Sequence, residues 1–231
     1  MKYYDFTAKQ LEDKALELLI EFDEERIHKT KPIDVYAVIE KCLNVPYDWK
    51  YLTPDQSVLG VTVFSGGTLW VWPESKYYDG LIPYQIDVEP GTILIDSTLT
   101  EQKYRGRENF TVMHEVFHQV LHKKCFRTMP KNYVHLTESK TIEGNIRYAS
   151  YALAVIERQA NACAAAFLMP RNLVIKNYKG WYEYMGDKTS KQAEDGIIEA
   201  MAGEFSVSKQ AMFIRLKQLG LMGENKENLL K

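Results

Sequence analysis

The hydrophobic residues near the start of the chain recur at helical spacing. Thr7 and Gln10 have the form of a capping box, in which a threonine and a residue three positions later satisfy the first backbone amides of a helix. The apolar residues that follow lie at i, i+3, i+4 and i+7: Leu11, Ala15, Leu18, Leu19 and Phe22. Pro32 suits a first helical turn, and a second apolar stripe then runs toward Asn44 and Pro46: Ile33, Tyr36, Ile39, Cys42 and Leu43. The pattern therefore predicts two helices in this region.

The character of the chain changes over residues 47–96, where β-branched and aromatic residues are interrupted by turn residues. Val58–Phe64 and Leu69–Trp72, joined by a Ser-Gly-Gly-Thr turn, predict a β-hairpin. Thr92–Asp96 is a short apolar run and predicts a later, buried strand. Residues 73–90 are rich in tyrosine, proline and glycine, so we expect a loop with one irregular strand there.

Helical periodicity returns in the second half of the chain. Over residues 108–122 one side of the predicted helix is apolar: Phe110, Met113, Phe117, Val120 and Leu121. Residues 123–144 are polar, basic and turn-like, so we expect a loop. A long helix is predicted from about 145 to 168, where Pro170 stops it, and two or three shorter helices complete the chain. Helices, a small sheet and further helices together predict an α+β fold.

The composition is that of a globular protein with balanced charge. Hydrophobic residues make up 45% and charged residues 26%, and the net charge of -2 gives no overall attraction to nucleic acid or to anionic membranes. The three cysteines are widely spaced and form neither a disulfide framework nor a CxxC metal knuckle. The N-terminus lacks the apolar segment of a signal peptide, and no window approaches about eighteen consecutive apolar residues. We therefore expect a soluble, cytoplasmic protein.

The strongest chemical signal is the HExxH sequence His114-Glu115-Val116-Phe117-His118. Residues four apart lie on the same face of an α-helix, so both imidazoles can bind one ion, and zinc takes histidine nitrogen as a ligand. Glu115 projects beside them, where it can take a proton from a water molecule on the metal. A surface helix with fortuitous spacing is the alternative, and the motif alone does not exclude it.

A catalytic zinc needs a third protein ligand and an open position for water. His122 lies about 12 Å along the axis from His114 and cannot reach the same ion from a straight helix, so we expect a packed or solvated helix-end histidine. Glu157 is the preferred third ligand, because the alanines after it allow two helices to approach closely. Asn161, one turn later, can accept the spare N–H of a zinc-bound histidine. The alternatives are an ordinary salt bridge for Glu157 and a simple interhelical hydrogen bond for Asn161.

These two segments resemble a known family. RENFTVMHEVFHQVLH at 107–122 and ERQANACAAAFLMP at 157–170 are similar to the paired signature helices of the ImmA/IrrE family of zinc metallopeptidases. Cys163 stands where that family usually has phenylalanine, and Phe167 replaces a common leucine. Both positions are predicted to be packing sites, so the resemblance covers the chemically important residues.

The resemblance implies a role for each residue of the motifs. It makes zinc the cofactor, with His114, His118 and Glu157 as its ligands. It makes Glu115 the general base and gives Asn161 the position that supports a ligand. The resemblance also implies an active-site edge strand in the sequence before the HExxH motif, which could hold an extended peptide by main-chain hydrogen bonds.

The predicted architecture follows from the periodicity and the resemblance together. We expect N-terminal helices at 1–46, a zincin-like metallopeptidase core at 47–180, and a C-terminal helical, helix-turn-helix-like module at 181–231. In the core, a small mixed β-sheet is expected to pack on the active-site helix and on the third-ligand helix.

The segment Val207–Leu221 has features of the second half of a helix-turn-helix. Ser208 suits an N-cap, and four apolar residues are expected to face a core: Ala211, Ile214, Leu216 and Leu219. Three basic residues could meet phosphates: Lys209, Arg215 and Lys217. The resemblance includes this module as part of the family's fold, and the net charge is slightly acidic. We therefore do not expect direct nucleic-acid binding.

Hydrolysis of an amide also requires a donor near the developing oxyanion. Four residues lie within plausible reach of the motif along the chain: Tyr148, Tyr151, Arg158 and His135. The sequence does not choose among them, and His135 and Tyr151 are the first candidates for mutation.

These observations predict a cytoplasmic zinc-dependent endopeptidase with a protein substrate. The resemblance adds a substrate class, because members of the family commonly cleave helix-turn-helix repressors of prophages or other mobile elements. Two other functions stay open: a regulator that grips such a repressor without cutting it, and a DNA-binding regulator acting through residues 205–221. The intact HExxH favours the enzyme, because Glu115 would have no evident use in a binding protein.

Overall fold

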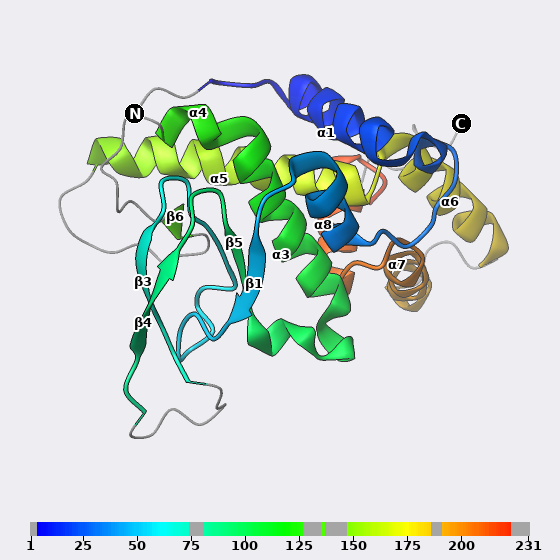
Figure 1. The fold of residues 1–231 in the computed structure, drawn as a ribbon. Helices are drawn as coiled ribbons and strands as arrows, with labels where there is room; N and C mark the ends of the chain where they lie inside the picture. The colour runs from blue at the N-terminus through cyan, green and yellow to red at the C-terminus, as the bar shows by residue number, and fades with distance from the viewer. Residues whose placement is uncertain (1–3, 74–80, 127–134, 137–146, 186–190, 223–231) are drawn as a thin grey trace.

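The fold is α+β and mostly helical, with its strands gathered on one side of the molecule and its C-terminal helices on the other (Figure 1). The computed structural model describes residues 4–73, 81–126, 135–136, 147–185 and 191–222, and for 135–136 and 147–150 it describes the main chain only. Helix α3 runs through the middle, between the strands and the other helices (Figure 1). This central helix carries the HExxH sequence.

The described helices follow the predicted order. The α-helices are α1 (Ala8–Asp23), α2 (Val35–Val38), α3 (Arg105–Phe117), α4 (Lys123–Phe126), α5 (Arg147–Leu168), α6 (Arg171–Tyr184), α7 (Lys191–Phe205) and α8 (Lys209–Gln218). Two π-helical segments, Ile39–Leu43 and His118–His122, continue α2 and α3. Short 3-10 turns occupy Glu24–Ile27, Ser97–Thr100 and Gln102–Tyr104.

The two N-terminal helices form where the sequence predicts them. Thr7 and Gln10 make the complete capping box of α1, and the apolar stripe is buried as predicted at Leu11, Ala15, Leu18 and Leu19. The second helix begins later than Pro32, because the Asp34 side chain caps it by accepting two backbone amides. It ends at Asn44, which adopts the left-handed conformation with φ 49°.

The strands form two sheets. They are β1 (Tyr47–Lys50), β2 (Gly60–Thr62), β3 (Gly67–Val71), β4 (Tyr84–Val88), β5 (Ile93–Asp96) and β6 (His135–Leu136). A four-stranded sheet has the order β1-β5-β2-β6, and β3 pairs with β4 in a separate two-stranded sheet. Only β1 and β5 are parallel among these pairs, so the larger sheet is mixed. Every residue of β5 is buried, as the apolar run at Thr92–Asp96 predicts.

The predicted hairpin between Val58–Phe64 and Leu69–Trp72 is wrong. Strand β2 pairs with β5 and β6, whereas β3 pairs with β4 from the segment expected to be mainly loop. The burial pattern explains the difference, because β2 is buried on both faces while β3 alternates and is half exposed. Gly66 adopts φ 71° and lets the chain leave one sheet for the other.

The helix that carries the motif differs in detail from the prediction. It begins at Arg105 and changes to π-helix at His118. A π turn bonds from i to i+5, which shifts later residues around the axis. Val120, predicted to lie on the apolar face, is therefore 42% exposed, whereas Leu121 is buried. The predicted loop at 123–144 contains the short helix α4 and the strand β6, and its other residues lie outside the described part.

The largest hydrophobic cluster of the described residues joins segments from the first long helix, α1, to the end of α8. Its members come from helices α1, α3, α5, α6, α7 and α8 and include Leu19, Val116, Ala164, Met201 and Leu216. The segments predicted as N-terminal helices, core and C-terminal module therefore pack around a shared interior. None of the helices in the described part of the chain is long and apolar enough to cross a lipid bilayer.

The C-terminal helix α8 is fixed by a buried arginine. Ser208 is its N-cap, and Leu216 and Leu219 face the core as predicted. Arg215, predicted as a possible phosphate contact, is instead 3% exposed and forms a bidentate ion pair with Glu12 of α1. Its Nε also donates to the Met169 carbonyl at 3.0 Å. Arg215 is therefore a structural residue, and Ile214, predicted to face the core, is 45% exposed.

Candidate metal centre

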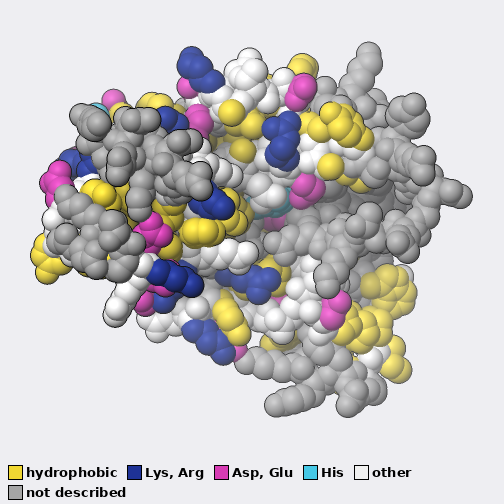
Figure 2. Space-filling model, turned by 180° about the vertical axis from the view of Figure 1, so that it is seen from behind, with side chains coloured by type: hydrophobic (Ala, Val, Ile, Leu, Met, Phe, Trp, Pro, Cys, Tyr) yellow, Lys and Arg dark blue, Asp and Glu magenta, His cyan; other side chains and the backbone are white. Residues whose placement is uncertain are grey.

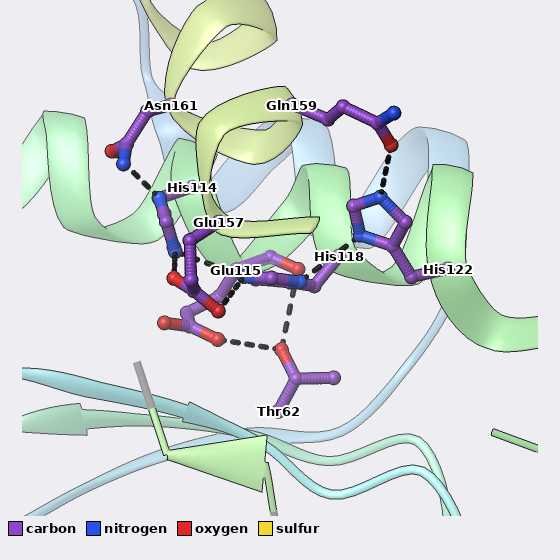
Figure 3. Close-up of polar contacts among 8 residues, drawn as sticks. All are labelled: Thr62, His114, Glu115, His118, His122, Glu157, Gln159 and Asn161. Carbon is purple, nitrogen blue, oxygen red and sulfur yellow. Dashed lines mark hydrogen bonds and ion pairs between the residues drawn. The ribbon is translucent and has the colours of Figure 1, made fainter. Parts of the chain in front are cut away.

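Helices α3 and α5 bring three ligand groups together, as Figure 3 shows. The ring nitrogens Nε2 of His114 and His118 lie 2.9 Å apart. Glu157 of α5 places Oε2 3.1 Å from Nε2 of His114 and Oε1 3.4 Å from Nε2 of His118. The ligand atoms of these three residues all lie within 4.8 Å of one another, so the group could hold a metal ion.

Small side chains allow α5 to approach α3. Ala160 and Ala164 are fully buried and belong to the same core cluster as Val116 on α3. Cys163 and Phe167, the two departures from the family pattern, are also fully buried, and the Phe167 ring contacts Phe117 edge-on. Both are packing positions, as predicted.

Asn161 orients the first histidine. Its Oδ1 lies 3.0 Å from Nδ1 of His114. The amide oxygen can only accept, so Nδ1 of His114 carries the proton and donates. The lone pair of His114 is then on Nε2, which faces Glu157 and His118. This is the supporting role that the sequence predicts for Asn161.

A second chain of hydrogen bonds orients His118. Its Nδ1 lies 3.1 Å from Nδ1 of His122, and Nε2 of His122 lies 3.0 Å from Oε1 of Gln159. Gln159 in turn donates through Nε2 to the Tyr4 carbonyl at 2.6 Å. Figure 3 shows His122 reaching back to His118 on one side and to Gln159 on the other.

The Tyr4 carbonyl determines which group donates and which accepts in each of these hydrogen bonds. The Tyr4 carbonyl can only accept, so Gln159 presents its NH₂ group there and its oxygen to His122. Neutral His122 therefore carries its proton on Nε2 and accepts through Nδ1. His118 then donates through Nδ1 and keeps its lone pair on Nε2, toward Glu157. The side chains of His122 and Gln159 and the Tyr4 carbonyl thus fix the tautomer of His118.

The donor set fits a divalent cation. Two lone pairs on nitrogens 2.9 Å apart, with a carboxylate beside them, make an electron-rich group that repels itself unless a positive charge is present. Nitrogens that share one tetrahedral zinc at ~2.0–2.1 Å lie roughly 3.3 Å apart, which is close to the observed separation. Burial alone would lower the pKa of His114, but the hydrogen bond to Glu157 and the charges of Glu115 and Glu157 raise it above its ordinary value. The group therefore attracts positive charge.

Glu115 projects from α3 toward the sheet, with its carboxylate beside that of Glu157 (Figure 3). It is completely buried, and the Thr62 hydroxyl of β2 donates to its Oε2 at 2.7 Å. Gly60, two residues earlier on β2, makes this approach possible. A Cβ on Gly60 would lie 2.6 Å from Oε1 and 2.9 Å from Cγ of Glu115. The strand therefore holds the Glu115 carboxylate beside the ligand group without contributing a ligand.

The structure describes the two candidates for oxyanion stabilisation, Tyr151 and His135, to different extents. Tyr151 is 65% exposed on α5, and no hydrogen bond joins it to the ligand group within the described part of the chain. The main chain of His135 lies in β6 and pairs with Thr62, next to the strand that holds Glu115. The side chain of His135 lies outside the described residues, as does that of Tyr148.

Sequence reasoning missed the roles of three residues. His122 is 1% exposed and therefore packed, one of the two predicted alternatives, but its hydrogen bond to His118 was not predicted. Its spacing to His118 repeats the four-residue interval of the motif and could have signalled the contact. Gln159 lies between Glu157 and Asn161 but on another face of α5, and Thr62 comes from a distant strand, so no local pattern indicates either.

Comparisons with protein-family models and with curated proteins find no match for this chain. The resemblance to the ImmA/IrrE family therefore stays a prediction that rests on the residues of 107–122 and 157–170.

Proposed function

We propose that the protein is a zinc-dependent endopeptidase with a zincin-like core. The observation that carries the proposal is the group of His114, His118 and Glu157 from two helices, with Glu115 held beside it by a separate strand. A metal site that only stabilises the fold has no need of an additional, oriented carboxylate. Three protein ligands also leave a zinc coordination position for substrate or water.

The chemistry that zinc supplies when bound is Lewis acidity, which polarises a carbonyl and lowers the pKa of water. The role of Glu115 is to accept the proton of the attacking water at its carboxylate and to deliver it to the leaving amine. Thr62 fixes the orientation of that carboxylate through Oε2. His122 and Asn161 keep the Nε2 lone pairs of the two histidines directed at the metal position.

The substrate that we propose is a protein, and the resemblance points to a helix-turn-helix repressor of a prophage or mobile element. Cleavage in the cytoplasm would relieve repression. Burial of Arg215 removes one of the three basic residues that a DNA-binding role for α8 would use. Lys209 pairs with Glu199 at 2.7 Å, but both side chains are exposed, so the burial of Arg215 is the observation that argues against DNA binding by α8.

Metal content is the first test. Elemental analysis of the purified chain should give about one zinc per molecule, and Glu157→Ala should lose most of it because only two imidazoles remain. Glu17→Ala on α1 is the matched control, since Glu17 is an exposed residue far from the ligand group in the sequence, and it should retain its zinc. Equal zinc in the Glu157 and Glu17 variants would contradict the assigned ligand set.

Cleavage is the second test. The zinc-loaded chain is incubated with purified helix-turn-helix repressors, with and without a chelator, and the products are identified by mass spectrometry. Glu115→Gln should keep zinc but lose at least about a thousandfold in rate, because no base then takes the proton. Stable binding of the repressor without cleavage by the wild type would identify a non-cleaving regulator instead.

A further inference from the structure

A cavity of about 1060 Å³ opens directly beside the ligand group. Glu157 and Asn161 form one part of its wall, so the cavity borders the proposed metal centre. The remaining walls come from α3, α5 and α8, three helices that are far apart in the sequence. Figure 2 views the molecule from this side, with histidine and acidic side chains visible in a hollow near the middle of the face.

The floor of the cavity is apolar. Ala154, Ala162 and Ala165 lie along one face of α5, and Phe110 and Ile214 face them from α3 and α8. The small side chains on α5 give the cavity its depth. Ile214 is 45% exposed because it borders this cavity and not the core. The floor therefore suits an apolar side chain.

The rim of the cavity is basic. Arg107 is exposed and forms no ion pair with any residue that the structure describes, and among the same residues Arg158 pairs with Asp5 alone, at 3.6 Å. Both partners of that pair are more than half exposed, so solvent screens it and a ligand can replace it. Among the described lining residues Glu157 is the one carboxylate, and it faces the histidines. Figure 2 shows dark-blue Lys and Arg side chains on both sides of the hollow.

We propose that this cavity binds a substrate segment in which an apolar residue is accompanied by an acidic one, close to the cleaved bond. The apolar side chain lies against the alanines of α5, and the carboxylate pairs with Arg107 or Arg158. The inference rests on the proposed function, because the metal position defines where the cleaved bond lies. A nucleic-acid strand fits less well, because it carries a phosphate at every nucleotide and would leave most of them unpaired on an apolar floor.

Peptide hydroxamates provide a binding test that does not depend on turnover. A hydroxamate binds zinc and directs its attached residues along the cleft, so Leu-Glu and Leu-Gln versions compare a carboxylate with its neutral isostere. Each pair is made with the hydroxamate at the C-terminus and, separately, on an N-terminal succinyl group, because these place the residues on opposite sides of the metal. Affinity is measured by calorimetry on the zinc-loaded chain.

The Leu-Glu compound should bind about tenfold more tightly than Leu-Gln on one side of the metal, as expected for one charge-assisted pair. The advantage should disappear in the double variant Arg107→Glu, Arg158→Glu and persist in Arg171→Glu, an exposed arginine of α6 outside the cavity. Ala162→Phe should weaken both compounds without loss of zinc, because the larger side chain fills the floor.

Each contrary result has a distinct meaning. Equal affinity of the Glu and Gln compounds on both sides, or an advantage that survives the double variant, overturns this inference and leaves the proposed function standing. A wild-type chain that binds no zinc overturns the proposed function, and this inference with it. Displacement of the hydroxamate by a single-stranded oligonucleotide more readily than by an acidic peptide would assign the cavity to nucleic acid.

Discussion

At the scale of single residues, the proton positions on the two ligand histidines are decided by groups that bind no metal. Asn161 fixes His114 directly, whereas His118 is fixed through His122 and Gln159. The Asn161 oxygen and the Tyr4 carbonyl can only accept hydrogen bonds, and these two acceptors set the tautomers of His114 and, through Gln159 and His122, of His118. Both Nε2 lone pairs therefore point at the proposed metal position.

Removal of the His122 acceptor should weaken metal binding. His122→Phe keeps an aromatic ring of similar size but leaves Nδ1–H of His118 without a buried acceptor, so His118 no longer has a preferred tautomer. We expect zinc affinity to fall by about 10–100-fold, the usual effect of losing such a partner. Competition with a fluorescent chelator measures the affinity, and ¹⁵N chemical shifts of the His118 ring report the tautomer.

A second variant, His122→Gln, separates the loss of the hydrogen-bond acceptor from a loss of packing. His122→Gln retains an acceptor oxygen and should recover most of the affinity, together with the original ¹⁵N shifts. If His122→Phe lowers thermal stability but leaves both zinc affinity and the His118 shifts unchanged, the positioning role is refuted.

At the scale of secondary-structure elements, the close contact between strand β2 and helix α3 defines where Glu115 lies. Gly60→Ala would put a Cβ within 2.6 Å of the Glu115 carboxylate, and Thr111 of the same helix is only 2.9 Å away. Either the strand or the Glu115 side chain must move by a substantial fraction of an ångström. We expect a loss of about a hundredfold in cleavage rate with zinc content unchanged, because misplacement by about 1 Å has this effect.

Gly180→Ala is the matched control for this prediction. Apart from the adjoining residues and the nearby backbone of the helix, no atom lies within 4 Å of the added Cβ, and the residue is inside α6. An alanine there should stabilise the protein slightly, by about 0.5–1 kcal/mol, and leave the rate unchanged. Full activity of Gly60→Ala would show that the position of Glu115 is not set by β2.

The elements that the sequence predicts well are those defined by local spacing. The capping box at Thr7, the stripe of α1 and the helical placement of His114 and His118 all depend on residues within two turns of one another. The meeting of Glu157 with the histidines was predicted from residue type and from the family resemblance, and the geometry agrees. Local periodicity alone predicts α3 and α5, but it does not predict that they contact each other.

The elements that the sequence does not predict depend on distant partners. Strand β2 and strand β3 are adjacent in the chain and separated by a glycine turn, which is the ordinary signal of a hairpin, yet each finds its partner elsewhere. The π turn after Phe117 has no simple sequence signal, although it determines which residues after His118 are exposed. Thr62 meets Glu115 only after β2 has been placed against α3.

At the scale of the whole molecule, the ion pair between Glu12 and Arg215 joins the first long helix to the last. Arg215 is almost completely buried, so Glu12→Ala leaves a buried charge without its carboxylate. We expect the free energy of unfolding to fall by about 2–3 kcal/mol, somewhat less than for a fully buried pair because Glu12 is partly exposed. Urea denaturation followed by circular dichroism measures the change.

Two comparisons isolate the cause of this loss. Glu17→Ala breaks the exposed pair with Lys14 on the same helix and should cost less than about 0.5 kcal/mol. The double variant Glu12→Leu, Arg215→Met removes both charges and should recover most of the stability. If the Glu12→Ala variant is as stable as Glu17→Ala, the prediction is wrong, and Arg215 then pairs with another residue or becomes hydrated.

The hydrogen-bond chain from His118 to the Tyr4 carbonyl links metal occupancy to the backbone ahead of α1. Thermodynamic coupling is reciprocal. If the hydrogen bond to the Tyr4 carbonyl increases metal affinity by orienting His118, then a bound metal ion must stabilise that hydrogen bond and the segment before α1 to the same extent. Protease cleavage between Tyr4 and Thr7 would then be slower in the holo form and would, once it occurred, release the ion more readily.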